Sequence, residues 1–164
     1  MISMIRIDDR LIHGQVAVMW SKQLGVSRIL VASDKIAAND MQVNALKMAA
    51  PAGIKAFVLP IQKAADLIND PRAASMKILV LSNNPKDIYE VLQKINEKPL
   101  LNLANYGRIG GEPLSEKQKL TETVYVTNED KEIFNKIFNM GYDFEYQPLP
   151  SDSKQSLKEL LRGK

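Results

Sequence analysis

Short apolar runs, many of them β-branched, alternate along the chain with segments of helical periodicity. Runs of this kind predict strands. Runs that are apolar throughout, such as Ile78–Leu81, indicate burial on both faces of a sheet. The expected strands are Ile2–Ile7, Ile29–Ala32, Ile54–Leu59, Ile78–Leu81, Leu100–Ala104, Val124–Val126 and Phe144–Tyr146.

Between the runs, apolar residues recur every three to four positions, which predicts helices packed on one face. Val16, Met19, Trp20 and Leu24 share such a face and are expected in the core, and Gly25 follows as a left-handed stop. The same spacing recurs in Ile88–Ile95, Ile133–Phe138 and Leu157–Leu161.

Start signals precede three of these helices. Asn84 is expected to cap a helix whose first residue is Pro85. Thr127 and Asp130 resemble a capping box with Asp in the usual Glu position. Ser153 is expected to cap the last helix.

The alternation of strands and helices predicts an α/β fold with a mostly parallel central sheet of about seven strands and helices on both faces. A length of 164 residues fits a single domain. In such sheets, sites form beyond the carboxyl ends of strands, where loops lead into helices.

Composition restricts the function classes. The chain has no cysteine, so disulfides and thiolate chemistry are excluded. No apolar run approaches the roughly 18 residues of a membrane span, and the N-terminus becomes charged too early for a secretory signal. We expect a cytoplasmic protein that reaches the membrane only through partners. A net charge of +3 with scattered lysines gives no reason to expect nucleic-acid binding.

The segment RIDDRLIHGQV leads from the first strand into the first helix and concentrates the candidate chemistry. A helix N-terminus and an arginine both favour an anion such as phosphate. Neutral imidazole is a nucleophile at pH 7, and carboxylates beside it would orient the ring or the arginine. The residues that the segment brings together are Asp8, Asp9, Arg10, His13, Gly14 and Gln15.

From these residues alone the reaction stays open. His13 is the only histidine of the chain, and it is either a nucleophile or a surface residue without a role. Asp8 and Asp9 either support it or serve as helix caps and ordinary ion-pair partners. The sequence therefore predicts an anion site with a candidate nucleophile. A single histidine and scattered carboxylates give no metal cluster, and we expect no cofactor.

Other loops at the same sheet edge carry weaker candidates. The glycine-rich run that begins at Gly107 either wraps an anion or is a plain surface loop. Asp34, Asn39 and Asp40 follow the second strand and either border the active loop or cap helices. Asp34 and Gly107 are therefore candidates for a supporting shell only.

The segment IRIDDRLIHGQV resembles the active-site signature of the IIB component of the mannose/fructose/sorbose-type sugar phosphotransferase system. The resemblance extends along most of the chain and implies that residues 1–164 form one such domain. Further similar segments are Val31–Pro60, Ile78–Ile88 and Leu101–Gly107.

The resemblance implies a phosphocarrier of the class protein-Nπ-phosphohistidine–sugar phosphotransferase. His13 matches the histidine that accepts a phosphoryl group from a phosphohistidine of the IIA component. The recipient is a sugar bound by the membrane components IIC and IID, either a hexose, sorbose or an amino sugar such as N-acetylgalactosamine. Arg10 matches an arginine that binds the phosphoryl group. Asp8, Asp9, Gly14 and Gln15 match the rest of the loop in supporting roles.

Such a carrier meets a donor protein and then a sugar site, so we expect an exposed His13. Whether the chain forms a homo-oligomer stays open. The main alternative is a flavodoxin-like module that binds a ligand or regulates, because the same fold serves many functions. The first strand-to-helix turn lacks both glycine-rich nucleotide fingerprints, and a serine hydrolase is disfavoured because no G-x-S-x-G occurs.

Overall fold

A seven-stranded sheet with the strand order β3-β2-β4-β1-β5-β8-β9 forms the centre of the molecule. The structure, a computed structural model, describes residues 1–163. All neighbouring strands are parallel except β8 and β9. The strands of this sheet are β1 (Ile2–Ile7), β2 (Arg28–Ala32), β3 (Lys55–Leu59), β4 (Ile78–Ser82), β5 (Leu101–Leu103), β8 (Phe144–Tyr146) and β9 (Gln155–Ser156).

Within residues 1–163, seven α-helices connect and cover these strands. The expected start signals form two of the observed caps. The Asn84 side chain accepts a hydrogen bond from the Asp87 amide, with Pro85 as the first helical residue. Thr127 and Asp130 form a reciprocal capping box. The helices are α1 (Gly14–Leu24), α2 (Asp34–Ala37), α3 (Asp40–Met48), α4 (Ile61–Asn69), α5 (Pro85–Lys94), α6 (Asn128–Asn139) and α7 (Leu157–Arg162), with short 3-10 turns at Pro71–Ala73 and Leu114–Glu116.

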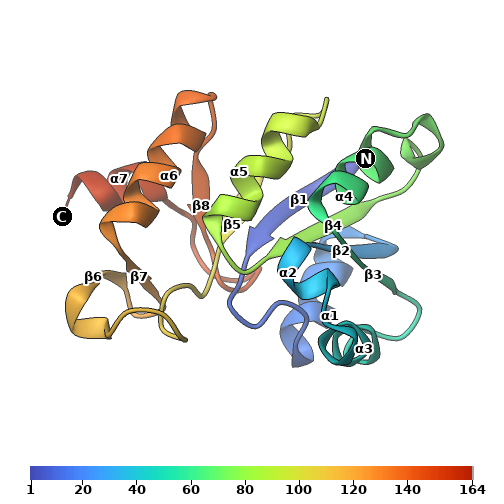
Figure 1. Cartoon of the computed structure of the whole chain (residues 1–164), viewed down its shortest axis with the longest axis horizontal. Coiled ribbons are helices and arrows are strands. Elements are labelled where there is room, and N and C mark those ends of the chain that lie inside the picture. Colours follow the sequence, from blue (N-terminus) through green and yellow to red (C-terminus); the bar gives the residue numbers. More distant parts are fainter. Residues whose placement is uncertain (164) are drawn as a thin grey trace.

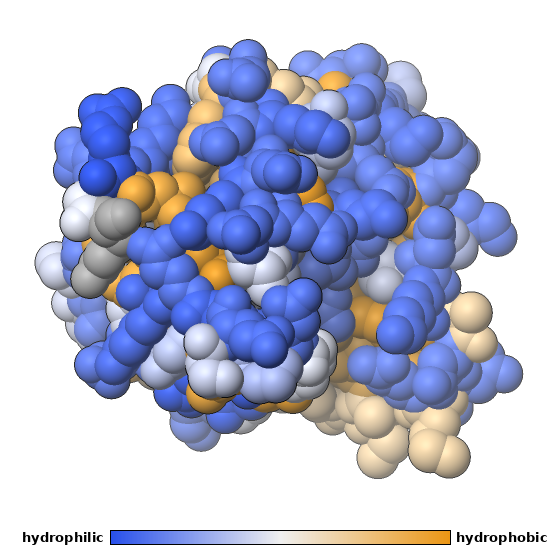
Figure 2. Space-filling model, turned by 60° about the vertical axis from the view of Figure 1, so that its left-hand side comes forward, coloured by the Kyte–Doolittle hydropathy of each residue, from blue (hydrophilic) through white to orange (hydrophobic). Residues whose placement is uncertain are grey.

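The helices form two layers, one on each face of the sheet (Figure 1). Side chains alternate along each strand, so that Ile78 and Val80 of β4 pack with α4, α5 and α6, whereas Leu79 and Leu81 pack with α1, α2 and α3. Figure 2 brings the α6 and α7 side forward and shows a mostly hydrophilic surface with apolar atoms in its recesses. The predicted α/β class with helices on both faces is thus confirmed.

The expectation that Val124–Val126 belongs to the central sheet is wrong. This strand, β7 (Val124–Val126), pairs antiparallel with β6 (Gln118–Thr121) in a separate two-stranded sheet. A single bridge between Tyr106 and Val124 joins it to the loop after β5. The hairpin therefore extends the loop region beyond the carboxyl ends of the strands, below α6 in Figure 1.

The C-terminal segment also differs from the expectation. Ser156, and not Ser153, caps α7 by accepting a hydrogen bond from the Glu159 amide. The reason is that Gln155–Ser156 first pairs with β8 as the edge strand β9. The buried face of α1 is narrower than the periodicity suggested, because Trp20 is buried but Met19 is 38% exposed.

The strand order places a topological switch point at β1, which lies between β4 and β5. The loops that follow these three strands meet at one edge, which is where open α/β sheets bind ligands. Among residues 1–163, no helix combines the length and apolar character that crossing a membrane requires.

Candidate active site

The loop Asp8–His13 connects β1 to α1, and backbone hydrogen bonds hold it to the neighbouring strand ends. The Asp8 amide donates to the Ser82 carbonyl at the end of β4, and the Asp9 amide donates to the Asn105 carbonyl after β5, both at 2.9 Å. Leu11 has a left-handed backbone with φ of 58° although it is not a glycine. Its buried side chain packs with the α1 layer, so packing stabilises this strained turn.

His13 is the N-cap residue of α1, but its side chain does not cap the helix. The ring instead turns back to the strand end, where Nε2 lies 3.1 Å from Oδ2 of Asp8. Among the described residues, Nδ1 has no hydrogen-bond partner. The side chain is 17% exposed, so the ring is less accessible than we expected, although it still reaches solvent.

Asp8 is completely buried and lies at the centre of the site. Its Oδ1 atom accepts a hydrogen bond from the Arg10 amide at 3.0 Å. Its Oδ2 atom faces His13, the Arg6 guanidinium at 3.2 Å and the Asn105 side chain at 3.4 Å. A buried carboxylate needs a cation and several hydrogen bonds, and this site supplies both.

Arg6 is a site residue that the sequence interpretation missed. It lies inside β1, is 2% exposed and forms a buried ion pair with Asp8. Its Nη1 atom also donates to the side-chain oxygen of Asn102 in β5, at 2.7 Å. The available signal was a charged residue within an apolar strand, since arginine is rarely buried without a partner.

Arg10 is exposed, and within the described part of the chain its guanidinium forms no hydrogen bond or ion pair. Of the two orienting roles expected for an aspartate, the structure shows the contact with the ring, because Asp8 contacts His13 but only the backbone of Arg10. Gly14 and Gln15 are also exposed and form the start of α1. Gly14 has a φ of 47°.

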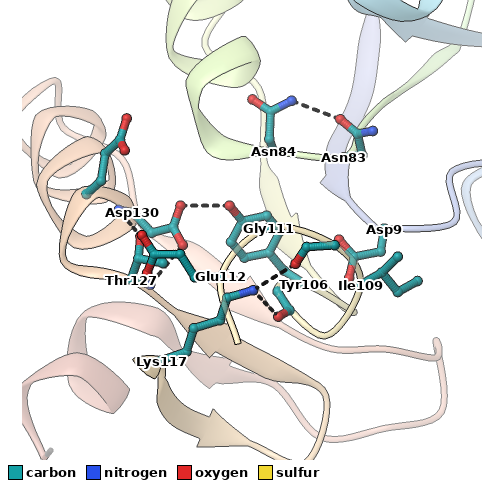
Figure 3. Close-up of a pocket in the computed structure, with 13 residues that line it drawn as sticks. Asp9, Asn83, Asn84, Tyr106, Ile109, Gly111, Glu112, Lys117, Thr127 and Asp130 are labelled. Carbon is teal, nitrogen blue, oxygen red and sulfur yellow. Dashed lines mark hydrogen bonds between the residues drawn. The ribbon is translucent and has the colours of Figure 1, made fainter. Parts of the chain in front are cut away.

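Asp9 lines a pocket of about 380 Å³ (Figure 3), and His13 is not among the residues that line it. Burial and the neighbouring Asp8 carboxylate raise the pKa of Asp9 to about 6, although the Arg108 and Gly107 amides and Lys117 act in the opposite direction. The two aspartates are thus in different environments: Asp8 contacts the histidine, whereas Asp9 contacts the glycine loop.

The glycine loop after β5 forms one wall of this pocket. The Lys117 ammonium group donates to the carbonyls of Gly107 at 2.7 Å and Gly110 at 3.3 Å. On the opposite wall the Tyr106 hydroxyl donates to Asp130 at 2.7 Å, which is one of the contacts drawn in Figure 3. Gly107 therefore lies beside Asp9, as its position at the sheet edge predicted, but His13 does not line this pocket.

The residues after β2 have structural partners. Asp34 accepts a hydrogen bond from the Ile61 amide at 2.8 Å, at the start of α4. Asn39 caps α3 through the Gln42 amide. These contacts agree with the capping interpretation, and no contact of Asp34 with His13 occurs within residues 1–163.

The geometry combines a nucleophile with an anion-binding surface. An ionised Asp8 can only accept a hydrogen bond, so Nε2 of His13 carries the proton and Nδ1 keeps its lone pair. The first amides of α1 have no partner within the helix and favour a negative charge there. Within residues 1–163, no group of three or more histidine, aspartate or glutamate side chains is arranged to hold a metal.

Comparisons with known proteins agree with this fold. A family model described as the phosphotransferase system (PTS) sorbose subfamily IIB component matches residues 2–164. A probable phosphotransferase enzyme IIB component of Streptococcus pyogenes is 35% identical over 162 residues, covering 98% of this chain and 99% of the relative. The mannose-specific EIIAB component of Escherichia coli is 33% identical over 160 residues, covering 98% of this chain but only 48% of that protein.

Solved structures give the same result. The IIBSor domain of the sorbose permease from Klebsiella pneumoniae has a TM-score of 0.90 at 27% identity, covering 99% of this chain and 97% of that one. The fold and these relatives thus define a phosphotransferase-type α/β protein. The chain belongs to the sorbose subfamily of PTS IIB components, which act by phosphoryl transfer in sugar uptake.

Proposed function

We propose that this protein is a phosphocarrier in which His13 accepts a phosphoryl group from a phosphohistidine of a IIA component. His13 then donates the group to a sugar bound by the membrane components IIC and IID. The observation that carries the proposal is the pairing of His13 Nε2 with Asp8 Oδ2 at 3.1 Å. This pairing leaves Nδ1 as the nucleophile at a surface that favours an anion.

The transfer step needs no net proton movement at His13. The lone pair of Nδ1 attacks phosphorus, the Nδ1–P bond forms, and the N–P bond of the donor breaks. The donor histidine keeps the electron pair of that bond. Throughout the step the Nε2–H group stays hydrogen-bonded to Asp8, which stabilises the positive charge that develops on the ring. In the second transfer a sugar hydroxyl oxygen attacks phosphorus: the O–P bond forms, the Nδ1–P bond breaks with its electron pair returning to Nδ1, and the hydroxyl proton passes to water.

Two groups stabilise the phosphoryl oxygens on this proposal. One is the set of free amides in the first turn of α1, directly after His13. The other is the Arg10 guanidinium, which is exposed and therefore available to a phosphoryl group shared with a partner. Gly14 and Gln15 support this surface by forming the helix start. Asp9 supports it from the other side by holding the glycine loop, with Gly107 and Asp34 in more remote structural roles.

The proposed partners and location follow from the family. The Escherichia coli relative joins A and B components in one chain, which supports a IIA donor for this protein. We propose that the domain comprises residues 1–164, that it acts in the cytoplasm, and that it reaches the inner face of the membrane through IIC and IID. The acceptor is a sugar of the kind carried by the family, either a hexose, sorbose or an amino sugar such as N-acetylgalactosamine.

The test is phosphorylation with phosphoenolpyruvate, the general phosphotransferase proteins and candidate IIA components. We expect one phosphoryl group per chain, labile in acid, on Nδ1 of His13 by phosphorus and nitrogen NMR. His13→Gln should keep the circular dichroism spectrum and melting temperature of the wild type but take up no phosphate. Stoichiometric labelling of that variant, or of a residue other than His13 in the wild type, would contradict the proposal.

A further inference from the structure

The Arg6 guanidinium is held in one orientation by groups from distant parts of the chain. Nη1 donates to the Asn102 side chain at 2.7 Å and to the Gln147 carbonyl at 3.3 Å. Nη2 donates to Asp8 at 3.2 Å and to the Pro148 carbonyl at 3.0 Å. Since residue 6 is 2% exposed, the guanidinium is shielded from solvent and held by these four acceptors.

Trp20 completes this enclosure from the α1 layer. The guanidinium carbon lies 5.2 Å from the centre of the Trp20 ring, within the range of a cation–π contact. The indole Nε1 donates to the Pro148 carbonyl at 2.9 Å, the same carbonyl that Arg6 binds. Arg6 and Trp20 thus both bind the segment after β8.

A single oxygen atom links Arg6 to the histidine. Oδ2 of Asp8 lies 3.2 Å from Nη2 of Arg6 and 3.1 Å from Nε2 of His13. Because the carboxylate is fully buried, a cation beside it offsets the cost of keeping a charge away from water. Arg6 is permanently protonated, so it supplies that charge without competing for the histidine proton.

We propose that Arg6 is a positioning residue for phosphoryl transfer: through Asp8 it fixes the tautomer and orientation of His13, with Nδ1 free. This inference rests on the proposed carrier function. Without Arg6 the buried carboxylate loses its cation and the hydrogen bond from Nη2 to Oδ2, so this oxygen is no longer held in place as the acceptor for Nε2. The ring then loses its one defined partner, and either nitrogen carries the proton.

The rival explanation is that Arg6 only stabilises the fold. Buried ion pairs contribute little to stability relative to apolar residues of similar volume, so stability alone does not explain an arginine at this place. The two explanations differ in one observable. A purely structural arginine leaves the His13 tautomer unchanged in any variant that folds, whereas a positioning arginine sets it.

The experiment compares Arg6→Met with Trp20→Phe, both in the full chain with nitrogen-15-labelled histidine. Trp20→Phe is the matched control, because it removes the indole bond to Pro148 but leaves the Asp8 contacts in place. In the wild type and in Trp20→Phe, ring NMR above the histidine titration should show neutral His13 with its proton on Nε2. Arg6→Met should show a mixture of tautomers. A single Nε2–H tautomer in folded Arg6→Met would overturn the proposal.

Transfer kinetics give an independent readout. Arg6→Met should lower the maximal rate of transfer from phosphorylated IIA by about 100-fold, as expected for a nucleophile misplaced by about 1 Å, while the KM for IIA changes little. Because Arg6 acts through Asp8, the double variant Arg6→Met/Asp8→Asn should be as slow as Asp8→Asn alone. If the double variant is slower than Asp8→Asn by the same factor that Arg6→Met loses alone, the proposal is overturned.

Two further outcomes separate this inference from the function on which it rests. If Arg6→Met does not fold, the wild-type spectrum decides, because neutral His13 with its proton on Nδ1 contradicts the Asp8 linkage. If His13 is not phosphorylated in the wild type but its tautomer depends on Arg6, the carrier role is wrong and the positioning of the ring by Arg6 is supported. If His13 is phosphorylated in the wild type but its tautomer does not depend on Arg6, the carrier role is supported and the positioning of the ring by Arg6 is wrong.

Discussion

Gly107 packs so closely against Tyr125 that a Cβ atom at residue 107 would overlap the Tyr125 carbonyl oxygen. Gly107 also has a φ of 88°, a backbone conformation that favours glycine. Tyr125 donates its amide to the Tyr106 carbonyl at 2.8 Å. This contact is how the hairpin β6–β7 attaches to the loop after β5, next to the Asp9 pocket.

Gly107→Ala should therefore destabilise the protein more than the strain of a side chain at a positive φ alone explains. Gly110→Ala is the matched control, because Gly110 has a φ of 67° but open space around its Cβ position. The control should cost about 1–2 kcal/mol, and Gly107→Ala should cost about 1–3 kcal/mol more through overpacking. Urea unfolding measures both. If both variants lose the same free energy of unfolding, the close approach of Gly107 to Tyr125 adds nothing to the cost of the substitution.

Arg10→Ala should slow phosphoryl transfer with little effect on stability. Removal of one charge-stabilising group at a reacting centre costs about 3–4 kcal/mol of barrier, or roughly 100- to 1000-fold in rate. The Arg10 side chain is exposed, so the free energy of unfolding should change by less than about 0.5 kcal/mol. Rapid-quench transfer from phosphorylated IIA gives the rate.

The control for Arg10 is Arg72→Ala, which removes an exposed arginine paired with Asp70 away from the site. This variant should transfer phosphate at the wild-type rate. Equal rates for the Arg10 and Arg72 variants would remove Arg10 from the mechanism.

Asp9→Asn should change how stability depends on pH. The pKa of Asp9 is raised from 3.8 to about 6 in the folded protein, first by burial and then by Asp8. Folding therefore favours protonated Asp9, and its stabilising effect is complete below pH 3.8 and is lost as pH rises through about 6. The melting temperature of Asp9→Asn relative to the wild type should rise from pH 4 to pH 7.

Asn83→Ala serves as the control for that pH series, since Asn83 lines the same pocket but does not titrate. Its melting temperature relative to the wild type should be the same at every pH. A relative melting temperature of Asp9→Asn that is flat from pH 4 to pH 7 would contradict the raised pKa.

Thr127→Ala should cost about 1 kcal/mol in the free energy of unfolding, because it removes the side-chain cap of α6. Thr127→Ser keeps the hydroxyl and should retain most of that stability. The capping box matters to the pocket as well, because Asp130 also accepts the Tyr106 hydroxyl. Thermal unfolding of the two variants checks this, and an alanine variant as stable as the serine variant would rule out the cap as a source of stability.

Local signals predicted the fold well. The bounds of β1, β7 and β8 were predicted exactly as observed, and the Asn84 and Thr127 caps formed as expected. These features depend on residues within a few positions of one another. The expectation that β7 belongs to the central sheet was wrong, because its pairing with Gln118–Thr121 depends on how the loop after β5 folds.

Only the part of the site that lies within one short segment of the sequence was predicted. The pattern from Asp8 to His13 lies in one loop, so its chemistry was readable from spacing. The contacts of Arg6 with Asn102 and Gln147 span 96 and 141 residues, and nothing in the periodicity indicates them. Met19 illustrates the same limit, since helical spacing placed it in the core whereas it is 38% exposed.

The bonds from Arg6 to the Gln147 and Pro148 carbonyls have a consequence for biosynthesis. His13 is synthesised early, but the Gln147 and Pro148 carbonyls that hold the guanidinium beneath it are added only 141 and 142 residues after Arg6. A nascent chain therefore carries the histidine without its completed support. Phosphorylation competence should arise only after Gln147 and Pro148 have been added and have reached Arg6, so that shorter products do not draw phosphate from the sugar-uptake system.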